Sequence, residues 1–153
     1  MRILGPGAPA PRFTLPNQFG RPVSLGDLGG VSPVTLVFFP LAFSRVCEGE
    51  LRELQGNLDL FSDAGSELIA VSVDSKHSLR AWSEEQGFTF TLLADFWPHG
   101  AVATSYGAFL PGRGHAGRAT FVIDTDGIVR ASFATAPGQA RSLGQYREAI
   151  AAL

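Results

Sequence analysis

The sequence predicts an α/β domain in which helices cover both faces of a central mixed sheet. Short apolar runs rich in β-branched and aromatic residues alternate with segments that have helical spacing, and the last two apolar runs are joined by a tight turn. With 153 residues the chain is long enough to bury a core, and we expect a single domain over residues 1–153. Hydrophobic residues make up 45% of the chain and charged residues 17%, a balance too apolar for intrinsic disorder.

The first expected elements are a hairpin, a buried strand and a helix. Residues 9–17 and 22–25 are short extended segments on either side of a turn. Residues 34–39 form a continuous apolar run, which is typical of a strand buried on both faces. One helix should follow and end at Gly65, because large apolar residues recur at steps of three and four: Leu51, Leu54, Leu58 and Phe61.

The remaining elements continue this alternation. Strands are expected at residues 68–73, 91–94, 119–123 and 128–133, and helices at residues 75–86, 99–106 and 142–153. Gly87 and Gly107 directly follow two of these helices, where glycine commonly ends a helix. Residues 124–127 form a hairpin-type turn, and the glycine-rich residues 112–117 are predicted to be a mobile loop.

Charge and terminal patterns exclude several classes of protein. The formal net charge is −2 and no basic run is present, so the chain has no electrostatic signature for nucleic acid or anionic membranes. The N-terminal residues lack the apolar stretch of a signal peptide, and no segment approaches the roughly 18 apolar residues of a membrane span. We therefore expect a cytoplasmic protein. Its three histidines have no ligand spacing, so neither a metal nor another cofactor is expected.

Cys47 is the single cysteine and the main candidate for a nucleophile. It lies just where the strand at 34–39 is expected to lead into a helix, and unpaired N–H groups and the helix dipole at such a position favour a negatively charged sulfur. Ser44 occupies the position of a capping-box serine, with its hydroxyl close enough to hydrogen-bond to Cys47. The alternative is that Ser44 only caps the helix and Cys47 is a small buried apolar residue.

The residues around Cys47 resemble the active site of a known family. Pro40, Ser44 and Cys47 form P-x-x-x-S-x-x-C, which is similar to the motif P-x-x-x-[T/S]-x-x-C of peroxiredoxins, and Arg118 precedes a late strand as an arginine does in that family. Residues 38–43 and 95–100 closely resemble the AhpE-type one-cysteine peroxiredoxins of actinobacteria. The similarity covers nearly the whole chain and implies a thioredoxin-like fold.

The resemblance implies a thiol-dependent peroxidase and a role for each motif residue. Cys47 would attack a hydroperoxide and become a sulfenic acid. Arg118 would stabilise charge on the breaking O–O bond, Ser44 would position peroxide and thiolate, and Pro40 would shield the sulfur. Glu50 would support the site by orienting Arg118 or a neighbouring arginine, although a solvated helix face is an equally good interpretation of its position.

The resemblance also implies partners. The substrates would be hydrogen peroxide and organic hydroperoxides, with peroxynitrite as a further candidate. Because the chain has no second cysteine, an external thiol must reduce the sulfenic acid, as mycothiol with a mycoredoxin-like protein does for relatives, or another glutaredoxin or thioredoxin system. Relatives usually form homodimers near the active-site loop. Four aromatic residues are candidates for a dimer contact or for the peroxide channel, where Phe43 is expected to contact substrate: Phe43, Phe96, Trp97 and Phe109.

Two other functions are compatible with the same residues. Ser44-Arg45-Val46-Cys47 is similar to a thioredoxin-fold C-x-x-C that has lost its first cysteine, which would suit a thiol transferase or disulfide reductase. A non-catalytic redox sensor would use the same oxidation of Cys47 to change its partners.

Overall fold

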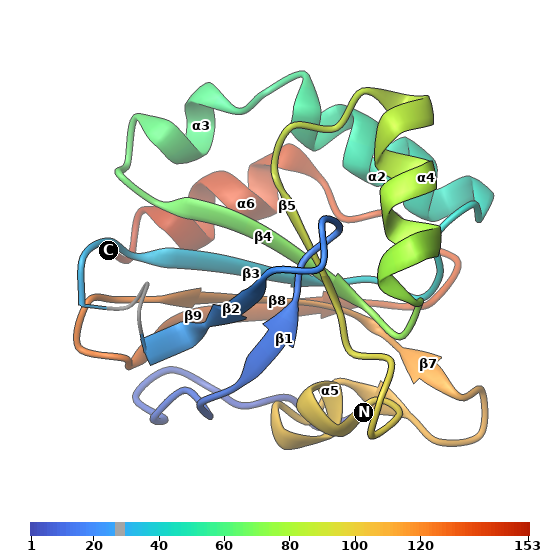
Figure 1. Ribbon diagram of the computed structural model, residues 1–153. Helices are drawn as coiled ribbons and strands as arrows, with labels where there is room; N and C mark the ends of the chain where they lie inside the picture. The colour runs from blue at the N-terminus through green and yellow to red at the C-terminus, as the bar shows by residue number, and fades with distance from the viewer. Residues whose placement is uncertain (27–29) are drawn as a thin grey trace.

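The computed structural model describes residues 1–26 and 30–153, and it confirms the predicted mixed sheet (Figure 1). The sheet has five strands in the order β5-β4-β3-β8-β9. The parallel part pairs β4 with β3 and β5, whereas β8 runs antiparallel to β3 and β9. The strand bounds are β3 (Val34–Phe38), β4 (Glu67–Ser72), β5 (Thr91–Ala94), β8 (Arg118–Ile123) and β9 (Val129–Thr135).

Helices lie on both faces of the sheet, as predicted, but unequally (Figure 1). One face carries four helices: α2 (Arg45–Gln55), α3 (Asp59–Ser62), α4 (Lys76–Gln86) and α6 (Leu143–Ile150). The other face is covered by the short helix α5 (Ala101–Ser105) and by a hairpin of β1 (Thr14–Pro16) and β2 (Pro22–Ser24). Successive residues at the end of β3 point to opposite faces of the sheet and pack in two hydrophobic cores. Val37 and Phe39 pack in the core on the four-helix side, and Leu36 and Phe38 pack in the core on the opposite side.

The prediction of one helix ending at Gly65 is wrong, because the segment contains two helices. Gly56 follows the last residue of α2, and α3 begins only at Asp59. The Asn57 side chain donates a hydrogen bond to the Glu53 carbonyl oxygen at 2.8 Å. A glycine followed by an asparagine that bonds to the backbone weakens helix propagation, although the apolar spacing continues across the break.

The glycine-rich segment at 112–117 also differs from its prediction as a mobile loop. Its last part forms β7 (His115–Ala116), which pairs with β6 (Phe109–Leu110) in a small antiparallel sheet. Strands of two residues are too short to show any periodicity in the sequence. The segment therefore contributes the turn and the second strand of a hairpin directly before β8.

The other elements appear inside or close to their predicted ranges. Gly87 ends α4 in the left-handed conformation, with φ 73°, as expected from its position after residues 75–86.

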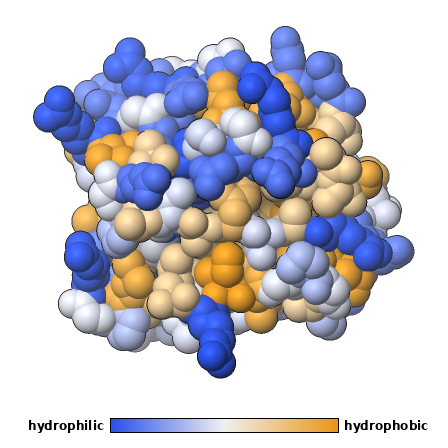
Figure 2. Space-filling model, turned by 180° about the vertical axis from the view of Figure 1, so that it is seen from behind, coloured by the Kyte–Doolittle hydropathy of each residue, from blue (hydrophilic) through white to orange (hydrophobic). Residues whose placement is uncertain are grey.

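Seen from behind, the molecule shows apolar residues as patches interrupted by hydrophilic ones (Figure 2). Within residues 1–26 and 30–153, no helix has the length and apolar character that crossing a bilayer requires.

Candidate active site

Cys47 lies in the first turn of α2, at the carboxyl end of β3. The chain leaves β3 after Phe38, and Ser44 is the N-cap residue, with an extended backbone at φ −86° and ψ 145°. Cys47 is the third residue of the helix and has no solvent exposure. The sulfur therefore lies where the sequence predicts, near unpaired helix N–H groups and removed from bulk water.

Ser44 begins the helix as predicted, but its hydroxyl does not form the expected bond with Cys47. Ser44 Oγ donates its proton to the Leu41 carbonyl oxygen at 2.7 Å, and the structure holds no side-chain cap at the start of α2 among the residues it describes. A hydroxyl has only one proton, so Ser44 can act on a nearby group only by accepting a hydrogen bond in this arrangement. The expected capping geometry is thus replaced by a local turn.

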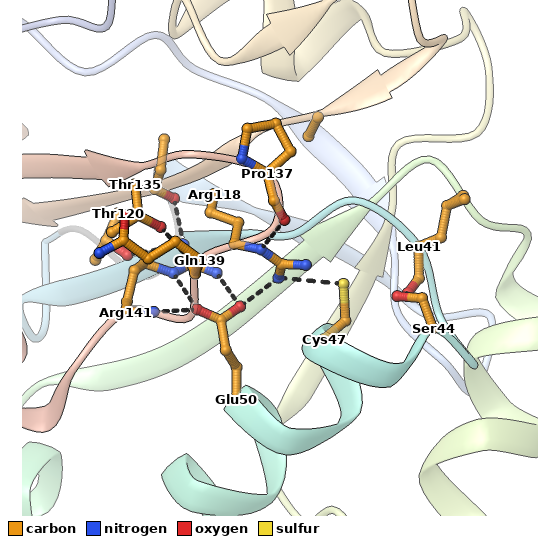
Figure 3. A network of polar contacts seen from close by, with 12 residues as sticks. Leu41, Ser44, Cys47, Glu50, Arg118, Thr120, Thr135, Pro137, Gln139 and Arg141 are labelled. Atoms are coloured by element: carbon orange, nitrogen blue, oxygen red, sulfur yellow. Dashed lines mark hydrogen bonds and ion pairs between the residues drawn. The ribbon is translucent and has the colours of Figure 1, made fainter.

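Arg118 and Cys47, which are 71 positions apart in the sequence, come together in the fold (Figure 3). Arg118 is the first residue of β8, and its Nη1 donates to Cys47 Sγ at 3.3 Å and to Glu50 Oε1 at 2.5 Å. The arginine is 3% exposed and the glutamate 4%. The apolar environment that an inert cysteine would have is therefore absent on this side of Cys47, because a buried guanidinium contacts the sulfur.

Glu50 lies one turn after Cys47 on α2 and binds two arginines rather than facing solvent. Its partner besides Arg118 is Arg141, which was not singled out from the sequence. Arg141 Nε donates to Glu50 Oε2 at 3.0 Å, Arg141 Nη2 donates to Oε1 at 3.1 Å, and the Arg141 backbone N–H donates to Oε2 at 2.7 Å. Glu50 thus orients both Arg118 and a neighbouring arginine, and the interpretation as a solvated helix face is wrong.

The only signal for Arg141 in the sequence was the expectation that Glu50 orients either Arg118 or a neighbouring arginine. The two residues are 91 positions apart, and no motif connects them. Arg141 is 3% exposed, and its Nη1 also donates to the Ala119 carbonyl oxygen at 3.0 Å and to Thr120 Oγ1 at 3.1 Å. These bonds attach the start of α6 to β8 behind the sulfur.

The charges of this cluster do not cancel without the cysteine. Burial alone would raise the pKa of Glu50, but hydrogen bonds and charge from Arg141, together with the charge of Arg118, hold that pKa below its usual value. Glu50 is therefore an anion at neutral pH. Two guanidinium groups and one carboxylate leave a surplus of one positive charge, which a thiolate at Cys47 would balance.

The segment 136–141, between β9 and α6, holds Arg118 from its other side. Arg118 Nε donates to the Pro137 carbonyl oxygen at 2.6 Å, and Thr135 Oγ1 donates to the Gln139 carbonyl oxygen, also at 2.6 Å (Figure 3). With both Nε and Nη1 engaged, the plane of the guanidinium is fixed relative to Cys47 Sγ. The arginine is thus oriented before any substrate arrives.

The remaining predicted site residues lie in or near the turn that leads into α2. Pro40 is buried two residues after the end of β3. Phe43, 54% exposed, has φ 64° and its ring centroid lies 6.2 Å from that of Trp82. Two other predicted aromatic residues, Phe96 and Trp97, are largely exposed, whereas Phe109 is half-buried against His99.

In the described part of the chain, no three His, Cys, Asp or Glu side chains lie close enough together to hold a metal ion. Two of the histidines contact backbone oxygens instead. His99 Nε2 lies 2.6 Å from the Gly114 carbonyl oxygen, and His115 Nδ1 lies 2.8 Å from that of Ala116.

Comparisons with known proteins find similar sequences over most of the chain. A sequence model of the AhpC/TSA family matches residues 6–132. Alkyl hydroperoxide reductase E of Mycobacterium tuberculosis strain H37Rv is 44% identical over 151 residues, which cover 99% of both chains. Peroxiredoxin Bcp of Escherichia coli is 32% identical over 139 residues, covering 87% of each chain.

Solved structures show the same similarity in three dimensions. The crystal structure of peroxidoxin BcpB from Mycobacterium tuberculosis superposes with a TM-score of 0.83 at 27% identity, over 97% of this chain and 96% of that one. The reduced 2-Cys peroxiredoxin of Plasmodium vivax gives a TM-score of 0.86 at 28% identity, over 97% of this chain and 81% of that one.

Proposed function

The chain belongs to the AhpC/TSA family, and on that premise we propose how its residues divide the work of the family's chemistry. It is a one-cysteine peroxiredoxin with a thioredoxin-like fold, a thiol-dependent peroxidase that takes a hydroperoxide as substrate and a thiol as reductant. For this chain we propose hydrogen peroxide, organic hydroperoxides and peroxynitrite as the oxidants, and residues 1–153 as one domain.

The reaction begins with attack of the Cys47 thiolate on the terminal oxygen of the peroxide. An S–O bond forms, the O–O bond breaks, and the leaving oxygen takes a proton to become water or an alcohol. The sulfur is oxidised to a sulfenic acid while the peroxide is reduced. Cys47 is the only candidate for this step, because the sequence contains no other cysteine.

Arg118 is proposed to act on both the thiolate and the breaking bond. The observation that carries this role is the 3.3 Å contact from Arg118 Nη1 to Cys47 Sγ inside a buried cluster with surplus positive charge. A free thiol with an ordinary pKa of about 8.5 is about 3% ionised at pH 7, so ionisation alone gains at most about 30-fold in rate. A donor aimed at the developing oxyanion contributes a further 2.7–4 kcal/mol, roughly 100- to 1000-fold.

The neighbouring residues shape the space around the sulfur. We assign Ser44 to substrate positioning through its oxygen, which can still accept a hydrogen bond from a peroxide O–H while the hydroxyl donates its own proton to the Leu41 carbonyl oxygen. Pro40 has no N–H and would form an apolar wall that limits water access to the sulfur. Phe43 would contact the organic part of a substrate with its exposed ring. Glu50 supports the site by orienting Arg118.

The sulfenic acid is proposed to be reduced by mycothiol with a mycoredoxin-like protein, or by another glutaredoxin or thioredoxin system, in the cytoplasm. The resemblance to AhpE-type peroxiredoxins implies this choice of thiol, and an external thiol is needed because the sequence has one cysteine. We also propose a homodimer. Three exposed aromatic side chains on two loops support an interface: Phe43, Phe96 and Trp97, which are 54%, 52% and 79% exposed.

A coupled assay of peroxide consumption tests the proposed function. With catalytic amounts of protein and an excess of mycothiol and mycoredoxin, many equivalents of hydrogen peroxide should be consumed for each equivalent of protein, and Cys47→Ala should consume none. A reaction that stops after one equivalent with every thiol tried would indicate a sensor instead. Faster reduction of a disulfide than of any peroxide would indicate a thiol transferase.

A further inference from the structure

Asp74 lies outside the peroxiredoxin motif, yet its carboxylate contacts the turn that leads into α2. Asp74 follows β4, and its Oδ2 accepts a hydrogen bond from the Ala42 backbone N–H at 2.8 Å. Ala42 is only 8% exposed and lies between Pro40 and Ser44, two residues of the motif. The contact thus joins the carboxyl ends of two neighbouring parallel strands, β3 and β4, where the active site lies.

The carboxylate is itself held in place. Ser72 Oγ donates to Asp74 Oδ2 at 2.6 Å, and the Asp74 backbone N–H donates to Ser72 Oγ at 3.2 Å. Ser72 is 1% exposed and is the last residue of β4, so the position of the hydroxyl is determined by the sheet. Oδ2 therefore presents a fixed acceptor to the turn.

The turn needs such a restraint because it contains an unfavourable backbone conformation. Phe43 has φ 64°, and within the described ranges it is the only residue other than glycine with a positive φ. An aromatic residue adopts the left-handed region only when its surroundings hold it there. Ala42, which Asp74 binds, directly precedes Phe43, and Ser44, the N-cap of α2, directly follows it.

We propose that Asp74 is a positioning residue of the peroxidase site, which holds the 41–44 turn so that the first turn of α2 presents Cys47 to Arg118. The inference rests on the proposed function, since it assigns a further residue to the same reaction. Asp74 acts through the Ala42 backbone and does not itself contact the sulfur or the substrate.

The sign of the effect separates positioning from simple charge. If charge alone mattered, removing a negative charge from the protein should favour the thiolate and speed the reaction. Loss of the acceptor for Ala42 N–H should instead slow the reaction, because the turn can then relax away from the geometry that places Cys47 Sγ beside Arg118. An asparagine keeps an acceptor oxygen but loses the charge, so it should behave like the wild type.

The experiment compares the second-order rate constant of Cys47 oxidation by hydrogen peroxide in stopped flow for wild type, Asp74→Asn and Asp74→Ala. We expect Asp74→Ala to be at least tenfold slower and Asp74→Asn to lie within threefold of wild type. The matched control is Asp124→Ala, which removes a carboxylate that holds the β8–β9 turn through Asp126 N–H and Ile128 N–H and should leave the rate unchanged.

Each outcome has a defined meaning. An Asp74→Ala protein with a native circular dichroism spectrum and a rate equal to or above that of wild type would overturn the inference, even if its melting temperature falls. If Asp74→Ala does not fold, Ser72→Ala keeps the carboxylate but loses the hydroxyl that orients it; a rate two- to fivefold lower supports the role, and an unchanged rate overturns it. If wild type itself reacts no faster than a free thiol, the proposed function fails, whatever the variants do.

Discussion

Helices α2 and α6 both begin at a serine N-cap, but they use that serine differently. Ser142 closes a full capping box with Gln145 at the start of α6: its hydroxyl accepts from the Gln145 N–H, and the Gln145 side chain accepts from the Ser142 N–H. Ser44 at the start of α2 turns away from the helix and donates to Leu41. The third helical residue is Gln145 in α6 and Cys47 in α2.

The difference shows what distinguishes a functional helix start from a structural one. In α6 the box satisfies the first N–H groups and stabilises the end of the chain. In α2 no side chain among the described residues caps the helix, and the electrostatic partner of its first turn is a sulfur that must stay reactive. Stability at that point comes instead from the buried cluster of Glu50, Arg118 and Arg141.

Removal of the Glu50 carboxylate should have the largest effect on stability. Glu50→Ala removes the carboxylate that pairs with two buried guanidinium groups, and we expect a loss of about 3–5 kcal/mol in the free energy of unfolding, measured with urea. The matched control is Glu84→Ala, which breaks an exposed pair with Arg80 within one helix and should cost no more than about 0.5 kcal/mol. Similar losses in both variants would contradict the assignment of stability to the cluster.

Replacement of Arg118 should have the largest effect on the chemistry at the start of α2. Arg118→Ala is expected to lower the rate constant with hydrogen peroxide by about 100- to 1000-fold, because the oriented donor at 3.3 Å from the sulfur is lost. The rate must be followed up to a pH at which the thiol is fully ionised. If the variant then reaches the wild-type rate, Arg118 acts on ionisation only and has no role in the transition state.

The two N-cap serines should give opposite results when each is replaced by alanine. Ser142→Ala should reduce the free energy of unfolding by about 1 kcal/mol with an unchanged peroxide rate, because it removes a real cap. Ser44→Ala should have the smaller effect on stability and the larger one on rate, since its hydroxyl caps nothing in α2. Equal effects on rate would remove the functional distinction between the two helix starts.

The smallest expected effect is the pH dependence that Glu50 contributes. Its pKa in the folded protein is lowered from the ordinary value of 4.5, so its contribution to stability is complete above that value and is lost as the pH falls from 4.5 through the folded pKa. The stability difference between wild type and Glu50→Gln, from urea unfolding, should thus be constant between pH 6 and 7 and shrink below pH 4.5. A difference that grows on acidification would contradict a lowered pKa.

The sequence predicted the parts of the site that lie in one motif or directly beside a regular element. Cys47 and Ser44 could be placed because a buried strand precedes a helical pattern, and Arg118 because the family resemblance marks the residue before a late strand. Arg141 and Asp74 could not be placed. Their partners Glu50 and Ala42 are 91 and 32 positions away, and only the pairing of β3 with β4 and the docking of α6 bring them together.

The same limit explains the errors in the fold. The break at Gly56 lies inside an uninterrupted apolar period, and a competing bond from the Asn57 side chain is not visible in that period. The hydrogen bond from Ser44 to Leu41 lies in a turn where Phe43 has a positive φ, and no residue type in the segment predicts that backbone conformation. Regular elements follow from local patterns, whereas the orientation of a hydroxyl depends on the three-dimensional surroundings.

The most direct test is the rate constant of wild-type Cys47 with hydrogen peroxide at pH 7, compared with that of free cysteine at the same pH. Ionisation contributes at most about 30-fold, and the oriented arginine about 100-fold or more, so we expect an acceleration of at least about a thousandfold. An acceleration of about 30-fold or less would show that the protein supplies a thiolate and nothing further, which would contradict a site built to break the O–O bond.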